Sequence, residues 1–156
     1  MESQVTDRGI ELDVRLPTSA TAPSSARALV GGLRDRLDDD VLDDLVLVVS
    51  EVVTNCVRHA ELGPGDDITV RVRAASGNVR LEVVDHGRGF EPTQIGAHDP
   101  AMPGGWGLYI VDQLADRWGV ARESGTRLWV EIDTGPDGRR DSGAPRQGLG
   151  GGRGAA

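Results

Sequence analysis

Alternation of apolar and polar residues in several separate runs limits the fold of this chain more than any other feature. The runs occupy residues 10–16, 68–72, 79–83 and 127–133, with a shorter one near 120–122. Because successive side chains of a strand point to opposite faces of a sheet, a period of two residues indicates strands with one buried face. The sequence therefore predicts five strands, and the turn residues 76–78 predict a hairpin between the second and the third.

Three segments between these runs carry apolar residues at helical spacing. The first opens at Pro23 and carries apolar residues through Leu37, the second covers about residues 40–60, and the third covers about residues 107–118. Each of these helices needs an apolar surface to cover. We therefore expect an α+β fold, a two-layer sandwich in which a mixed, mainly antiparallel sheet carries the helices on one face.

Length and composition indicate one domain of ordinary size. The chain has 156 residues, of which 38% are hydrophobic and 27% are charged, and such a chain buries a substantial core. No stretch approaches the roughly 20 apolar residues that span a bilayer, and the first residues lack the pattern of a secretory signal. The single cysteine, Cys56, has no internal disulfide partner. We therefore expect a cytoplasmic protein with no membrane partner.

The charged residues exclude some classes of function. All 17 basic residues are arginine, 25 residues are acidic, and the net charge is −8. Four of the arginines but only one acid lie after Gly138, so the preceding body is more acidic than the total indicates. An acidic body repels phosphate backbones, and we expect no nucleic-acid partner. The absence of lysine excludes a Schiff base and a P-loop lysine.

The last part of the chain differs in composition from the rest. Residues 134–156 contain eight glycines, two prolines and almost no apolar side chains. Such a segment buries too little surface to offset the entropy lost on ordering. We expect residues 1–133 to form the folded domain and residues 134–156 to form a flexible tail rich in glycine, arginine and proline.

A stripe of polar residues follows the long second helix and consists of Asp44, Glu51, Asn55 and Arg58. At 100° per residue these side chains share one side of the helix. Glu51 and Asn55 are one turn apart, which places an oxygen ligand for Mg²⁺ beside a carboxylate able to orient a hydroxyl or a water. A solvated helix face is the alternative interpretation of the same residues.

A second motif, Asp85-x-Gly87-x-Gly89, follows directly from a predicted strand. An aspartate at a strand end can accept a hydrogen bond from an exocyclic amine, and glycines allow the backbone to approach a flat ligand closely. A turn capped by an aspartate has the same pattern.

A third motif, Gly104-Gly105-Trp106-Gly107-Leu108, opens the third helix. Glycines ahead of a helix expose backbone N–H groups at its positive end, where anions bind. The end of a flexible loop explains these glycines equally well. Residues 91–103, which precede the motif, show little periodicity and predict a mobile loop.

In this order and spacing, the three motifs resemble those of the GHKL ATP-binding family, which includes gyrase, a heat-shock chaperone, histidine kinases and anti-sigma-factor kinases. The segments SEVVTNCVRHA, VVDHGRGFEP, GGWGLYIVDQLADRWGV and GTRLWVEID look most like the small RsbW-type anti-sigma-factor serine/threonine kinases. The resemblance covers about residues 10–133. It implies the GHKL (Bergerat) ATP-binding fold, an α+β sandwich of the kind predicted above.

The resemblance implies ATP and Mg²⁺ as cofactors and gives each motif a role. Asn55 would hold Mg²⁺, which bridges the phosphates, and Glu51 would be the catalytic base that orients an attacking serine hydroxyl. Asp85 would bind the adenine amino group, in a pocket shaped by Gly87 and Gly89.

At the phosphates, the resemblance implies that Gly105 and Gly107 offer their backbone amides, with Leu108 completing the cofactor-binding motif. Residues 91–103 would form the lid over ATP. Phosphoryl transfer suits such a site, because positioning and charge neutralisation supply most of the catalysis.

The implied activity is transfer of the γ-phosphate of ATP to a serine of an anti-sigma-factor antagonist, with a sigma factor as second partner and a homodimer as a further expectation. These kinases usually carry an arginine in the lid, yet residues 91–104 contain neither arginine nor lysine. The alternative is therefore a nucleotide-binding regulatory module without kinase activity.

Two further interpretations have less support. A detached histidine kinase catalytic domain would need phosphoacceptor helices, for which the chain has no segment. A metal site at Cys56 and His59 has the right one-turn spacing, but no second paired motif accompanies it.

Overall fold

The computed structural model describes residues 9–59, 62–63, 65–75, 77–87, 106–122 and 124–135, with the backbone alone at positions 59, 106 and 107. These residues contain five strands and three helices. Their order is β1 (Ile10–Pro17), α1 (Ala22–Gly31), α2 (Asp39–His59), β2 (Asp67–Ala75), β3 (Asn78–Asp85), α3 (Trp106–Leu114), β4 (Arg117–Arg122) and β5 (Thr126–Asp133). The predicted α+β class is confirmed.

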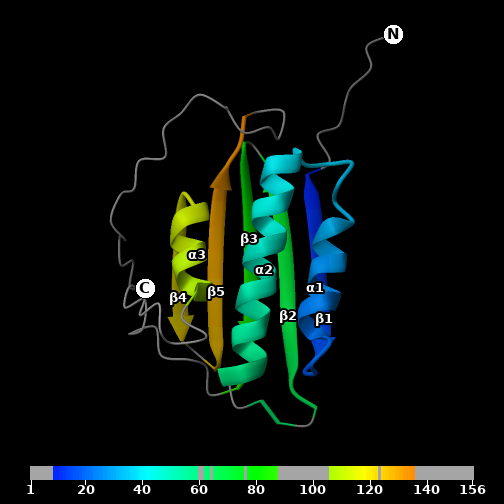
Figure 1. Ribbon diagram of the computed structural model, residues 1–156, viewed down its shortest axis with the longest axis vertical. Coiled ribbons are helices and arrows are strands. Elements are labelled where there is room, and N and C mark those ends of the chain that lie inside the picture. Colours follow the sequence, from blue (N-terminus) through cyan, green and yellow to red (C-terminus); the bar gives the residue numbers. More distant parts are fainter. Residues whose placement is uncertain are drawn as a thin grey trace.

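The five strands form one sheet in the order β1-β2-β3-β5-β4, and each neighbouring pair is antiparallel. Figure 1 shows the three helices together on one face of this sheet. The predicted two-layer sandwich is therefore confirmed, with a sheet that is antiparallel throughout the described strands. The predicted hairpin is present as well: Gly77 turns the chain between β2 and β3 with φ of +80°, a conformation that favours glycine.

The hydrophobic core lies between the sheet and α2, which crosses its middle between α1 and α3 (Figure 1). Leu45, Val49 and Val52 of α2 are at most 1% exposed, as are Val70 and Leu81 on the facing side of the sheet. Each such side chain contributes roughly 1.5–3 kcal/mol on burial. None of the helices in the described residues has the length and apolarity that crossing a membrane requires.

Helix α1 is shorter than its sequence pattern indicates. The pattern predicts a helix through Leu37, but α1 ends at Gly31. Gly31 and Gly32 interrupt it, because glycine is a poor helix former, and the Gly32 N–H closes the helix on the Ala28 carbonyl at 3.1 Å. Leu33 and Leu37 remain buried in the turns that follow. Apolar spacing thus identified the core residues correctly and the helix end wrongly.

Helix α3 also ends early, at Leu114, although the pattern predicts a helix to Trp118. The Asp116 N–H donates to the Glu131 carbonyl of β5 at 3.0 Å, and β4 starts at the next residue. Pairing with β5 therefore replaces the last predicted helical turn. Trp118 lies in β4, where it packs against the core, and its indole Nε1–H donates to Asp112 at 3.0 Å.

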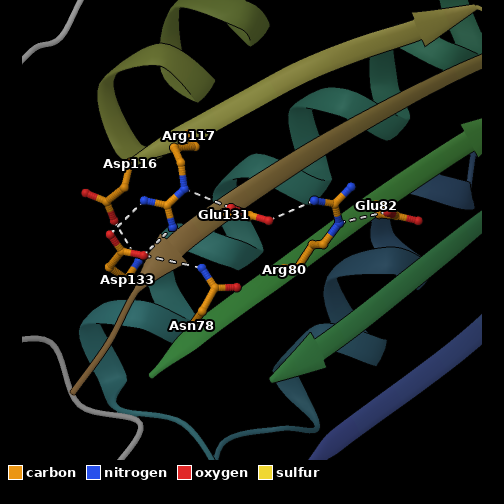
Figure 2. A network of polar contacts seen from close by, with 7 residues as sticks. All are labelled: Asn78, Arg80, Glu82, Asp116, Arg117, Glu131 and Asp133. Carbon is orange, nitrogen blue, oxygen red and sulfur yellow. Dashed lines mark hydrogen bonds and ion pairs between the residues drawn. The ribbon is translucent and has the colours of Figure 1, made fainter. Parts of the chain in front are cut away.

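The face of the sheet opposite the helices carries a network of ion pairs, shown in Figure 2. Glu131 lies at its centre: one carboxylate oxygen accepts from Arg80 Nη1 at 2.8 Å and the other from Arg117 Nε at 2.9 Å. Arg80 also donates to Glu82, and Arg117 donates to Asp133. These side chains come from β3, β4 and β5, so the network joins three strands across the exposed face.

Trp129 of β5 lies on this same face. The Arg80 guanidinium sits 4.7 Å from the centre of its ring, a distance at which a cation is attracted to the π electrons. A Cβ atom added to Gly119 would come within 2.8 Å of the indole. Glycine at this position of β4 is therefore what allows the ring to lie flat against the sheet.

We expect Glu131→Gln to lower the free energy of unfolding by about 1 kcal/mol at about pH 7, because partly exposed ion pairs contribute little and charged hydrogen bonds somewhat more. Partial burial works to raise the pKa of Glu131, but the hydrogen bonds from Arg117 and Arg80 outweigh it and hold the pKa below its ordinary value. The Glu131 carboxylate therefore contributes to the free energy of unfolding at pH values above its pKa in the unfolded chain. This contribution is lost as the pH falls through its pKa in the folded protein.

The measurement is urea unfolding of both proteins at about pH 7 and about pH 3, where the difference should shrink as Glu131 is protonated. Glu11→Gln is the matched control, because Glu11 makes an exposed pair with Arg73 at the edge of the sheet. A difference that stays constant with pH would contradict an electrostatic role for Glu131.

Candidate functional site

Segments that are distant in the sequence meet at one end of the sheet. β3 ends there at Asp85, β5 begins there at Thr126, and the two residues are register partners. Cys56, near the end of α2, contacts Asp85. The chain leaves α3 at the opposite end of β5, where the Asp116 N–H donates to the Glu131 carbonyl, so α3 begins near the end of the sheet at which β3 ends (Figure 1).

The carboxylate of Asp85 is almost completely buried, with the residue 1% exposed. Its Oδ1 accepts the Gly87 N–H at 3.2 Å, and its Oδ2 accepts the Cys56 thiol at 3.8 Å. Neither donor is charged, and no ion pair of Asp85 occurs among the described residues. A buried carboxylate without a cationic partner is costly for a protein, and it leaves acceptor capacity for a donor supplied from outside the chain.

Burial raises the pKa of Asp85 above its ordinary value, because the ionised form loses its hydration. Hydrogen bonds from the Gly87 N–H, the Cys56 thiol and the Thr126 backbone N–H work in the opposite direction, as does the nearby His86. Desolvation is the largest of these effects. A perturbed carboxyl group of this kind is typical of functional sites.

The Thr126 side chain provides a second polar group at the same place. Thr126 is 2% exposed, and its Oγ1 is a buried atom with no hydrogen-bond partner in the described residues. Since nearly all buried polar groups are paired, this hydroxyl is able to take a hydrogen-bond partner from a water or a ligand. The Asp85 carboxylate can accept a hydrogen bond, and the Thr126 hydroxyl can donate or accept one. Recognition of the edge of a heterocycle requires polar groups of these kinds.

The turn before β5 is fixed against the end of β3. Gly125 has φ of +135°, and a Cβ atom added there would lie 2.0 Å from the Asp85 carbonyl oxygen. No other residue fits at this position, because both the backbone conformation and the space exclude a side chain. A small hollow beside the turn is lined in part by Asp85, Ser124 and Thr126.

The polar stripe predicted on α2 is partly accessible. Glu51 and Asn55 are half-buried and Arg58 is exposed. Cys56 occupies the adjacent position but faces the core, 1% exposed. Asn55 and Cys56 therefore lie on different sides of α2. Asn55 is half-buried, whereas the thiol of Cys56 faces Asp85.

The predicted phosphate motif is only partly within the described residues. Gly107 lies in the first turn of α3, as predicted, and the Leu108 side chain is buried in the core. Any contact of Leu108 with an anion would therefore come from its backbone. Gly89, Gly105 and the predicted lid at 91–103 lie outside the described residues, as does the tail after residue 135.

The described residues contain no group of three or more His, Cys, Asp or Glu side chains able to hold a metal ion. Burial, and then the charge of Asp85, raise the pKa of the Cys56 thiol well above its ordinary value. Metal binding requires the thiolate, so the environment of Cys56 opposes a metal site at this residue. Asn55 remains a candidate ligand for Mg²⁺, together with oxygens of a bound ligand.

Two members of this site were absent from the motif-based prediction. Thr126 lay just before the predicted strand 127–133, after the glycine that makes the turn, and had no role in the prediction. Cys56 appeared as the single cysteine and as a weakly supported metal ligand beside His59. What the sequence does show, a hydroxyl residue entering an apolar strand, is a weak indication because such residues often lie at strand ends.

Comparison with known proteins shows which family the sequence matches. A family model described as a histidine kinase-like ATPase domain matches residues 16–132. Among curated proteins, the serine-protein kinase RsbW of Staphylococcus aureus strains RF122 / ET3-1 and MRSA252 is 28% identical over 131 residues, a match that covers 75% of this chain and 82% of the relative.

Among solved structures, the fold is similar to the histidine kinase domain of a blue-light activated histidine kinase from Erythrobacter litoralis, with a TM-score of 0.50 and 22% sequence identity. The match covers 72% of this chain and 57% of that one, so this chain spans little more than half of the neighbour's length. This likeness concerns the fold alone.

Proposed function

Because the chain belongs to the histidine kinase-like ATPase domain family, we propose that it binds ATP with Mg²⁺ and transfers the γ-phosphoryl group to a serine of a partner protein. The activity follows that of RsbW, a serine-protein kinase. The resemblance of the sequence to anti-sigma-factor kinases suggests the partners: an anti-sigma-factor antagonist as substrate and a sigma factor as second partner. A homodimer in the cytoplasm completes the proposal.

Two neighbouring groups at the end of the sheet carry the proposal. One is the buried carboxylate of Asp85, whose hydrogen-bond donors are uncharged. The other is the buried hydroxyl of Thr126, which has no hydrogen-bond partner in the described residues. Asp85 would accept a hydrogen bond from the amino group of adenine. Thr126 Oγ1, which lacks a partner in the described residues, would bind a ring nitrogen directly or through a water. The residues present therefore fit an adenine base.

On α2, the half-buried Asn55 would hold Mg²⁺ through its amide oxygen, and Glu51 lies one helical turn earlier. Mg²⁺, when bound with ATP, supplies positive charge that neutralises the phosphates. Glu51 would accept a hydrogen bond from the serine hydroxyl and fix its approach to the phosphoryl group. The N–H groups of Gly105 and Gly107 would bind phosphate oxygens at the start of α3.

A second candidate function is a nucleotide-binding regulatory module without transfer activity. The sequence of residues 91–104 favours it, because it contains no cationic side chain to reach the γ-phosphate. The same base-binding residues serve both functions. They differ in whether Glu51 acts on a substrate hydroxyl.

Calorimetric titration of the protein with Mg-ATP and Mg-ADP tests nucleotide binding, and we expect both to bind. Incubation with γ-labelled Mg-ATP and proteins captured on the nucleotide-loaded chain then tests transfer, with label expected on serine. Binding without transfer would favour the regulatory module. No heat of binding with either nucleotide would contradict both candidate functions.

A further inference from the structure

The thiol of Cys56 forms a direct link between α2 and the carboxylate at the end of β3. Its Sγ lies 3.8 Å from Asp85 Oδ2, and both residues are 1% exposed. A distance of this size is within the reach of a hydrogen bond donated by the larger sulfur atom, and a thiol is a weak donor. The contact joins residues 29 positions apart in the sequence.

The two carboxylate oxygens of Asp85 have different protein partners. Oδ1 accepts from Gly87, in the segment just after β3, at 3.2 Å, and Oδ2 accepts from Cys56. These two donors on opposite oxygens, together with the Thr126 backbone N–H, fix the rotation of the carboxylate about its side-chain bond. If the thiol were absent, α2 would contribute no described hydrogen bond to Asp85, and only the backbone N–H groups of Gly87 and Thr126 would orient the carboxylate.

The position of Cys56 on α2 gives this link a second consequence. Asn55, the candidate Mg²⁺ ligand, is the preceding residue, and Glu51 lies just over one turn earlier on the same helix. The link therefore ties the helix that carries the candidate phosphate-side residues to the carboxylate on the sheet. The alternative is a thiol that only fills space, as most buried cysteines do.

We propose that Cys56 is a positioning residue that orients Asp85 for recognition of the exocyclic amine of the nucleotide base. The proposal rests on the proposed function, because it assumes that Asp85 receives that amine. The thiol touches Asp85 rather than the base. Its loss is therefore expected to weaken binding only for ligands that carry the amine.

The experiment compares Mg-ATP with the Mg complex of purine riboside triphosphate, which lacks the 6-amino group. We expect Cys56→Ala to weaken ATP binding about fivefold, close to the loss of one modest hydrogen bond, with the affinity for the purine analogue unchanged. Cys56→Ser retains a donor at this position and should keep most of the preference for ATP. Cys56→Val fills the space of the thiol without a donor and should behave like the alanine variant.

Val53→Ala is the matched control. Val53 is a fully buried residue of α2 one turn before Cys56, so its truncation disturbs the packing of the helix without removing a hydrogen bond. It should lower thermal stability and leave the ratio of the two affinities as in the native protein. The valine variant of Cys56 serves as the test if the alanine variant does not fold.

The outcomes separate the two proposals. Loss of the ATP preference in the alanine and valine variants, with rescue by serine, supports the positioning role. Equal weakening of both nucleotides, or no change in either, overturns it and leaves nucleotide binding intact. Failure of the native protein to bind either nucleotide overturns the proposed function, and the positioning role with it.

Discussion

Replacing Asp85 with asparagine is expected to weaken Mg-ATP binding by about 100-fold, equivalent to the roughly 2–3 kcal/mol of a hydrogen bond to a charged group. The amide loses the negative charge, and its NH₂ group would face the amine of the base unless the amide is turned the other way. Because Asp85 is buried, water cannot easily replace the hydrogen bond that the variant loses. Calorimetric titration of the native and variant proteins measures the change.

The same substitution should leave the folded protein at least as stable as before. Burial raises the pKa of Asp85, so the native state holds a proton between the unfolded pKa of about 3.9 and the higher folded value. Stability therefore falls as pH rises through that window, and above it the ionised carboxylate costs folding free energy. Neutral asparagine removes this cost at about pH 7.

Thermal unfolding at neutral pH checks this second part of the expectation. Asp43→Asn makes the same change on the exposed surface of α2 and should alter neither ATP binding nor the melting temperature to a comparable extent. Native-like ATP affinity in Asp85→Asn would remove Asp85 from the base site. Lost affinity together with a large loss of stability would instead indicate a structural role.

Replacing Glu51 with glutamine is expected to reduce serine phosphorylation by at least about 100-fold, the usual lower range for loss of a general base. Glutamine keeps the size of the side chain but binds the substrate proton poorly. ATP affinity should stay at the native value, since the proposed base-binding residues lie on β3 and β5. Transfer is followed with γ-labelled ATP and the captured partner protein, and affinity by calorimetry.

Glu11→Gln is the control for this experiment, because Glu11 is an exposed residue of β1. Native rates in both variants would exclude Glu51 from the reaction and favour the regulatory module. Lost ATP binding in Glu51→Gln would place this residue in nucleotide binding instead.

The sequence predicted the layers of the fold well, because alternation and helical spacing report which side of an element is buried. It placed the end of α1 and the end of α3 wrongly for two different reasons. Gly31 and Gly32 interrupt a pattern whose apolar residues remain buried beyond the helix. Trp118 belongs to β4 because the next strand, β5, pairs with its segment, and helical spacing alone does not report that pairing.

Within the candidate site, the sequence predicted residues that form compact motifs and did not include those that only the fold brings together. Asp85 and Gly87 are two residues apart and are hydrogen-bonded. Thr126 reaches Asp85 through strand pairing, and Cys56 reaches it through the packing of α2 on the sheet. An unpartnered hydroxyl such as that of Thr126 can be recognised only when its surroundings are known.

The strand order has a consequence for how the protein opens. β3 and β5 are interior strands, with hydrogen-bonded neighbours on both sides, whereas β1 and β4 are the edges. Amide hydrogens of interior strands exchange with solvent only through the larger unfolding events, and edges open more often. Asp85 and Thr126 both belong to the interior pair, so we expect their spacing to persist when the edge strands open.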